Sequence, residues 1–116
     1  MDPGRNPDLE EIGTAYAQAV FLVAVQQGRV IGTGALIPTA DASAEIVRMS
    51  VAADMRRKGV ASALLQALCA RARTLGVRQL VLETTETWQD AIAFYEHAGF
   101  KETHHSNGDI YFRLEL

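Results

Sequence analysis

The chain has 116 residues, of which 48% are hydrophobic and 22% charged, and this ordinary composition excludes a disordered or fibrous protein. Its net charge of −3 argues against nucleic acid as a partner, and its single cysteine excludes an internal disulfide or a multi-cysteine zinc site. No apolar run reaches the roughly 18 residues that cross a bilayer. We therefore expect one soluble, cytoplasmic domain over residues 1–116, with no metal, nucleic-acid or membrane partner.

The N-terminal half combines a loose start with β-rich runs. Pro7 or Asp8, followed by acidic residues, is typical of the start of a helix. Gln27-Gly28 marks a turn between two apolar runs, which predicts an antiparallel hairpin. In chain order we expect a loose tail over residues 1–7, a helix over 7–19, strands over 21–25 and 30–37, a loop over 38–43 and a strand over 45–51.

The C-terminal half alternates helices and strands. Apolar residues recur at helical spacing after Gly59, and Gly76 follows this helix as a C-cap. Asn107-Gly108 predicts a second hairpin, because both residues tolerate positive φ. A strand–helix–strand unit between antiparallel hairpins predicts an α/β fold with a mixed sheet covered by helices. In chain order we expect a helix over residues 60–75, a strand over 77–84, a helix over 89–98 and strands over 100–105 and 110–116.

A basic segment, Arg56-Arg57-Lys58-Gly59, lies directly before the predicted helix over residues 60–75. The first N–H groups of a helix lack intrahelical partners and carry partial positive charge from the helix dipole. Gly59 lets an anion approach the backbone, and Arg56 and Lys58 add full positive charges. The segment therefore predicts a binding site for a small ligand that carries phosphate.

Two motifs resemble the GNAT superfamily of N-acetyltransferases. Arg56, Gly59 and Ala61 match the R-x-x-G-x-A form of its acyl-CoA pyrophosphate signature, and residues 91–100 match its A-x-x-F-Y-E-x-x-G-F landmark. Residues 48–51 and 81–85 are similar to the camello-like branch. The resemblance covers residues 20–116. It implies the GNAT-like acyl-CoA N-acyltransferase fold, a mostly antiparallel sheet with a central parallel strand pair, flanked by helices.

The resemblance implies acetyl-CoA as co-substrate and two catalytic residues. Tyr95 matches the usual general acid of the family, and Glu45 stands where several members carry a general base, with Glu83 as a second candidate for that base. The family often has asparagine at the position of Trp88, which leaves the role of this residue open. By resemblance, the contacts with acetyl-CoA fall on Met49, Ser50, Val51, Arg56, Arg57, Lys58, Gly59, Val60, Ala61 and Ser62.

The predicted function is direct transfer of an acetyl group from acetyl-CoA to an amine in a ternary complex, without a metal or a covalent enzyme intermediate. The acceptor stays open between a small-molecule amine, an amino acid conjugate, a peptide N-terminus and a lysine side chain. The alternative is a catalytically weak or inactive acyl-CoA-binding regulatory or scaffold module. A third reading is an unrelated phosphate-binding or structural α/β protein.

The N-terminal part departs from the pattern of the family. Members usually begin with a strand and two helices, and the loop between those helices forms much of the acceptor site. Here the first predicted strand begins at residue 21, which leaves room for one helix. We therefore expect an acceptor site that is more open, that a partner subunit completes, or that is missing, and a homodimer is one of these expectations.

Overall fold

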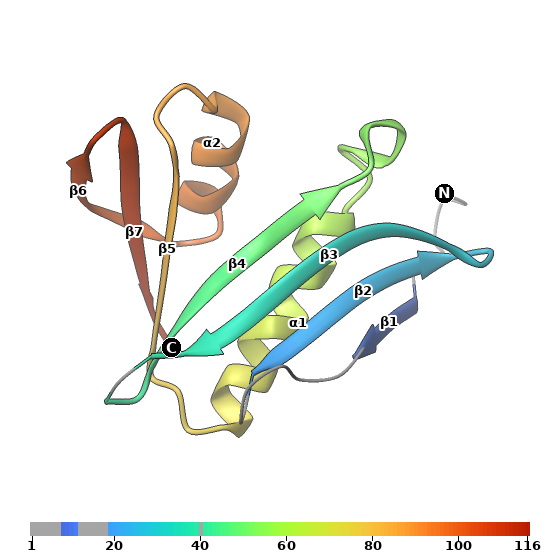
Figure 1. The fold of residues 1–116 in the computed structure, drawn as a ribbon, viewed down its shortest axis with the longest axis horizontal. Coiled ribbons are helices and arrows are strands. Elements are labelled where there is room, and N and C mark those ends of the chain that lie inside the picture. The colour runs from blue at the N-terminus through green and yellow to red at the C-terminus, as the bar shows by residue number, and fades with distance from the viewer. Residues whose placement is uncertain (1–7, 12–18, 40) are drawn as a thin grey trace.

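The computed structural model describes residues 8–11, 19–39 and 41–116 and arranges them as one sheet with helices packed on it (Figure 1). The seven strands follow the order β1-β2-β3-β4-β5-β7-β6. β4 pairs with β5 in parallel, and the other strand pairs of the described residues are antiparallel, which confirms the predicted mixed sheet. The elements are β1 (Asp8–Glu11), β2 (Val20–Gln26), β3 (Arg29–Pro38), β4 (Ser43–Val51), a short 3-10 turn (Ala53–Met55), α1 (Val60–Thr74), β5 (Gln79–Thr85), α2 (Gln89–His97), β6 (Lys101–Ser106) and β7 (Asp109–Glu115).

Both predicted hairpins are confirmed. Gln27 and Gly28 join β2 to β3 with φ angles of 51° and 78°, and Asn107 and Gly108 join β6 to β7 with 52° and 84°. Two consecutive residues with positive φ make the turn whose twist matches that of the flanking strands.

The predicted helix over residues 7–19 is wrong where the structure describes it. Residues 8–11 form β1, which pairs antiparallel with β2 from Asp8 opposite Val25 to Glu11 opposite Leu22. Leu9 packs against the core, and the acidic pattern that is typical of a helix start instead belongs to an edge strand. Pairing with β2 therefore outweighs a weak local helix preference. The predicted tail over 1–7 and the remainder of the helix over 12–18 lie outside the described residues.

β4 and β5 run side by side over only part of their length. Their register joins Ser43 to Gln79, Ala44 to Leu80 and Glu45 to Val81, after which the two strands diverge (Figure 1). Beyond the divergence β4 stays paired with β3, and β5 stays paired with β7. An opening is therefore built into the middle of the sheet.

Two glycines of β3 allow close packing beside this opening. A Cβ atom on Gly32 would lie 2.8 Å from Cγ1 of Val60, and one on Gly34 would lie 2.7 Å from Sδ of Met49. Opposite Gly34, β4 contains a bulge in which Arg48 has a φ of 57°. The Thr33 hydroxyl donates a hydrogen bond of 2.7 Å to the Arg48 carbonyl and holds this bulge in place.

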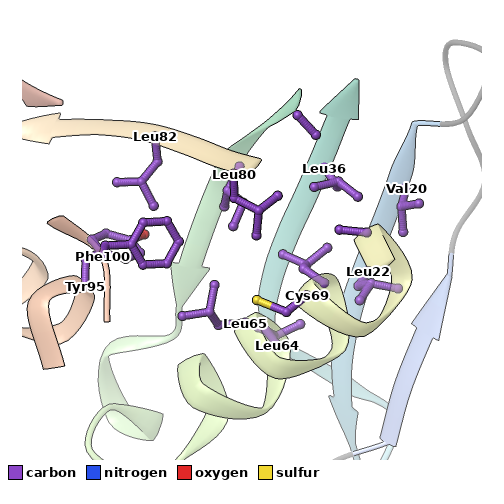
Figure 2. Packing of buried hydrophobic residues seen from close by; sticks show 14 of the residues in the cluster. Val20, Leu22, Leu36, Leu64, Leu65, Cys69, Leu80, Leu82, Tyr95 and Phe100 are labelled. Carbon is purple, nitrogen blue, oxygen red and sulfur yellow. The ribbon is translucent and has the colours of Figure 1, made fainter. Parts of the chain in front are cut away.

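The core lies between one face of the sheet and the two helices. Leu80 and Leu82, alternate residues of β5, belong to the same buried cluster as Leu64 of α1 and Tyr95 of α2. Figure 2 shows these side chains gathered around the helices. Because successive strand residues point to opposite faces, Glu83 lies on the face away from both helices. Among the described residues no helix has the length and apolar character needed to cross a membrane.

Candidate functional site

The loop between β4 and α1 is tied to the rest of the fold at two points. Arg29, at the start of β3, donates hydrogen bonds of 2.8 and 2.7 Å to the Asp54 carboxylate. Hydrogen bonding to this guanidinium lowers the pKa of Asp54 from 3.8 to about 2. Met55 follows and is buried in the core. The loop is therefore fixed directly before the basic residues begin.

α1 begins without a side-chain cap. Its N-cap is Gly59, with a left-handed φ of 83°, and the Ala63 N–H donates to the Gly59 carbonyl at 3.0 Å. The N–H groups of Val60, Ala61 and Ser62 therefore have no acceptor within the helix. A Cβ atom on Gly59 would meet nothing within 4 Å, so the space above this turn is open. Free amides, the positive end of the helix dipole and open space together form a cradle suited to phosphate.

The basic side chains that the sequence singled out surround this cradle. Arg56, Arg57 and Lys58 are all exposed, and Arg57 has a φ of 62°. Within the described ranges, the ion pairs engage other basic residues. The three charges are therefore available to an anion bound at the start of α1.

The divergence of β4 and β5 produces a cleft of about 230 Å³. One wall is the bulged part of β4, the other is the end of β5, and α2 supplies the remainder. The residues that line it are Ile46, Val47, Arg48, Met49, Leu82, Glu83, Thr84, Trp88, Ala91 and Tyr95.

Tyr95 brings a phenol to this cleft from α2. Its side chain is only 9% exposed, and its ring makes edge contacts with Phe94 and Phe100. Burial raises the pKa of Tyr95 above its ordinary value of 10. The phenol is therefore protonated at neutral pH and can donate a proton or a hydrogen bond.

Three residues that the resemblance assigns to acetyl-CoA, Met49, Ser50 and Val51, form the end of β4 beside the opening. Met49 lines the cleft, while Ser50 and Val51 continue β4 beyond it and pair with Thr33 and Gly32 of β3. In the described part of the chain, β4 after Glu45 has a strand partner on the β3 side only. Its other edge faces the opening and offers backbone groups to an extended amide-containing ligand.

The two candidate bases occupy different places. Glu45 belongs to the last parallel pair, opposite Val81, where β4 and β5 are still joined. Glu83 lies beyond the divergence and lines the cleft. Its cross-strand neighbour on β7 is Tyr111, whose pKa is raised chiefly by interaction with the Glu83 carboxylate.

Trp88 and Arg48 complete the rim of the cleft. Trp88 is the N-cap residue of α2 and is 64% exposed, which is unusual for a large aromatic side chain. The sequence singled out Trp88 but not Arg48, because no local pattern marks an arginine that takes a left-handed conformation in a bulge. Tyr111 was missed for a similar reason, since only the strand register brings it beside Glu83.

A second, more open hollow of about 470 Å³ lies beyond the C-terminal end of α1. Arg73, Arg78 and Leu116 contribute to its wall, and none of the predicted site residues does. The described residues contain no cluster of three or more side chains able to hold a metal ion. The cleft between β4 and β5 is therefore the candidate functional site.

Comparisons with known proteins relate this chain to a family of enzymes. The family model described as acetyltransferase (GNAT) family matches residues 2–100. The chain is 32% identical over 108 residues to the uncharacterized N-acetyltransferase YjgM of Escherichia coli (strain K12), covering 89% of this chain and 65% of that protein. It is 35% identical over 98 residues to the probable N-acetyltransferase camello of Xenopus tropicalis, covering 83% of this chain and 45% of that protein. The chain thus spans about half to two thirds of the length of these curated relatives.

Solved structures share the fold. A GNAT family acetyltransferase from Elizabethkingia anophelis, solved with acetyl-CoA bound, superposes with a TM-score of 0.83 at 18% identity. The match covers 96% of this chain and 99% of that one. At this identity the likeness shows the fold alone.

Proposed function

Because the chain belongs to the acetyltransferase (GNAT) family, we propose that it transfers an acetyl group from acetyl-CoA to an amine acceptor. The observation that carries this proposal is the position of the uncapped start of α1, which a loop over residues 52–59 connects to the strand that forms one wall of the cleft. Such an arrangement accommodates a ligand with a phosphate group at one end and an extended arm at the other. Acetyl-CoA has this form, and its thioester supplies the activated acetyl group.

The start of α1 fits the pyrophosphate. The free amides at residues 60–62 supply hydrogen-bond donors, and Arg56, Arg57 and Lys58 supply positive charge. The open space above Gly59 admits a phosphate oxygen close to the backbone. The backbone of Met49, Ser50 and Val51 then follows as the partner of the pantetheine arm.

In this proposal Tyr95 protonates the departing thiolate. Its side chain lines the cleft, and burial raises its pKa, so that the phenol keeps its proton at neutral pH and can donate it, or a hydrogen bond, to the thiolate as the C–S bond breaks. The surrounding aromatic rings of Phe94, Phe100 and Phe112 fix the orientation of this residue. The amine acceptor, a small molecule or a peptide, approaches the same cleft.

Two copies of the chain associate in this proposal. β6 is the last strand of the sheet, and all six of its residues are exposed. An exposed edge strand offers unpaired N–H and C=O groups to another strand. Light scattering should report a dimer at assay concentration, and a monomer there would exclude the association.

The activity is tested by incubating the chain with isotopically labelled acetyl-CoA and a panel of amines, followed by mass spectrometry of the products. The panel contains amino acids, 1,4-diaminobutane and lysine peptides. Labelled N-acetyl product that depends on the protein is expected, and saturable binding of acetyl-CoA without any product would instead select the inactive binding module.

A double variant tests the contribution of the basic residues at the start of α1 to acetyl-CoA binding. Combined Arg57→Gln and Lys58→Gln substitutions should weaken the binding of acetyl-CoA, because they remove two charges beside the free amides of α1. Combined Arg73→Gln and Arg78→Gln substitutions are the matched control, since they remove two exposed charges at the C-terminal end of α1, away from the loop. Equal acetyl-CoA affinity in the loop variant and the control would exclude a role for these charges.

A further inference from the structure

The loop over residues 52–59 carries a negative charge beside its positive charges. Its acidic residue is Asp54, which precedes the three basic residues of the loop. Hydrogen bonding to Arg29 is the largest cause of the lowered pKa of Asp54, and the charge of Lys58 also contributes, so Lys58 lies within electrostatic reach of this carboxylate. Without a partner, the carboxylate would repel a pyrophosphate bound at the start of α1 and would attract Lys58 away from it.

Arg29 pairs with this carboxylate from another element. It lies at the start of β3, and its Nη1 and Nη2 donate hydrogen bonds of 2.8 and 2.7 Å to Oδ2 and Oδ1 of Asp54. This bidentate geometry occupies both carboxylate oxygens and places a positive charge against the negative one. Both side chains are more than half exposed, and exposed ion pairs contribute only modestly to the stability of a fold. An unpaired charge at the same place still acts on a ligand bound within a Debye length of roughly 8–10 Å.

The strand that carries Arg29 borders the loop at both ends. At the beginning of the loop, the Ala52 N–H donates a hydrogen bond of 2.9 Å to the Ile31 carbonyl. Directly after its end, Val60 packs so closely on β3 that a Cβ atom on Gly32 would lie 2.8 Å from its Cγ1. The start of β3 is therefore held beside the loop and beside the first turn of α1.

Two other roles for Arg29 fit these contacts less well. A direct contact with a bound phosphate needs the terminal nitrogens, and both of them bind Asp54. Mechanical fixation of the loop is already supplied by the backbone hydrogen bond of Ala52 and by Met55, which is buried in the core. What Arg29 adds to the loop is the neutralisation of its carboxylate.

We propose that Arg29 is a positioning residue for acetyl-CoA, because it neutralises the Asp54 carboxylate and leaves the basic side chains of the loop available to the pyrophosphate. The proposal rests on the proposed binding of acetyl-CoA and adds to that site a residue that lies outside the loop. Arg29 is then needed only as long as the carboxylate is present.

The test measures acetyl-CoA affinity by isothermal titration calorimetry in Arg29→Gln, Asp54→Asn and the variant that combines them. Arg29→Gln should raise the Kd by about fivefold, as the loss of a partner from an exposed charge pair implies. The combined variant should bind with nearly the wild-type Kd, because the repelling carboxylate is gone as well. Asp54→Asn alone should bind at least as tightly as wild type. The effect of Arg29→Gln should shrink at high salt, which screens exposed charges.

Arg71→Gln is the matched control. Arg71 of α1 pairs with Glu11 of β1 at 3.0 Å, so the substitution removes the same charge and leaves a carboxylate without its partner. Arg71 lies about three helical turns after the start of α1, away from the phosphate cradle. Its substitution should leave the Kd for acetyl-CoA unchanged. In steady-state kinetics, Arg29→Gln should raise the KM for acetyl-CoA and leave kcat at saturation unchanged, which a general structural loss would not do.

Four outcomes would overturn the proposal. They are an unchanged Kd in Arg29→Gln, an equal loss in Arg71→Gln, a loss in Asp54→Asn as large as that in Arg29→Gln, and a combined variant that binds as weakly as Arg29→Gln. The third would indicate a mechanical link, and the fourth a direct contact of Arg29 with the ligand. In all four the wild-type chain still binds acetyl-CoA, so the proposed function keeps its support. A wild-type chain that binds no acetyl-CoA would remove both together.

Discussion

At the scale of the residue, Tyr95 belongs both to the hydrophobic core and to the lining of the cleft. Its ring packs with Phe100 and Phe112 in the core, while the same side chain lines the cleft. Burial favours the protonated phenol, which is the form a general acid needs. The helix that carries it therefore contributes a proton donor without an additional charged group.

Replacing Tyr95 with phenylalanine separates the contribution of the ring to packing from that of the hydroxyl group to the reaction. Tyr95→Phe should lower turnover by about 100-fold, because the proton donor is lost, and should leave acetyl-CoA affinity nearly unchanged, because the ring remains. Initial rates and thermal shifts with acetyl-CoA measure the two quantities. Turnover equal to that of wild type would remove Tyr95 from the mechanism.

The lowered pKa of Asp54 predicts that the free energy of unfolding depends on pH. Its folded pKa of about 2 is below its ordinary value of 3.8, so the Arg29 pair stabilises the fold above about pH 4 and the contribution disappears as the pH falls toward 2. Asp54→Asn should therefore lower the urea midpoint most above pH 4, and the difference from wild type should shrink on acidification. Arg29→Gln removes the same pair and should show the same pattern. A difference that stays constant with pH would contradict this origin.

The sequence predicts most readily those site residues that depend on local structure alone. Gly59 and the three basic residues before it could be predicted as an anion site, because the start of a helix has the same free amides in every fold. The pairing of Glu83 with Tyr111 depends on strand register between segments far apart in the chain. No pattern within either segment encodes that register, so this pairing is visible only in the structure.

At the scale of the element, the packing of α1 against β3 positions the phosphate cradle. Gly32 admits the first turn of α1 so closely that a Cβ atom would lie 2.8 Å from Val60 Cγ1 and 3.0 Å from Leu64 Cδ1. The Ser50 carbonyl lies 3.3 Å from the same point. The helix start, β3 and the end of β4 are therefore held together at one position.

Gly32→Ala tests this packing. The added methyl group must displace the first turn of α1, so we expect a loss of about 1–3 kcal/mol in the free energy of unfolding together with weaker acetyl-CoA binding. Val30→Ala, on the same strand at a position that is 53% exposed, should cost less and leave binding intact. Urea denaturation and thermal shift measure both effects. Unaltered binding in Gly32→Ala would show that the cradle tolerates movement of the helix.

Element types were predictable where periodicity was strong, and the exception is informative. α1, α2, the strands from β2 to β5, and β7 follow apolar patterns that the sequence displays. The six residues of β6 are polar, and the Asn107-Gly108 turn is what indicates this strand. β1 is four residues long, and its acidic composition suggests a helix start as readily as a strand. Only the free edge of β2 decides between them, and that edge exists in the folded sheet rather than in the local sequence.

At the scale of the whole molecule, the opening between β4 and β5 gives access to both faces of the sheet. The helix side holds the cradle at the start of α1 and the phenol of Tyr95, and the other side holds Glu83. In the proposed reaction, acetyl-CoA and the amine meet at this opening in a ternary complex without an enclosed pocket. The sequence indicated the start of α1, Tyr95 and Glu83 as separate candidates, and only the sheet topology shows how they lie relative to one another.

Binding of acetyl-CoA in this opening is measured most directly through Trp88, which is the single tryptophan of the chain and lines the cleft with 64% of its surface exposed. Titration with acetyl-CoA should produce a saturable change in its fluorescence, and ligand at 100 times its dissociation constant should stabilise the fold by about 2.7 kcal/mol. The combined Arg57→Gln and Lys58→Gln variant should shift the titration to higher concentration. Unchanged fluorescence together with an unchanged melting temperature at high acetyl-CoA concentration would contradict the assignment of the cleft as the acetyl-CoA site.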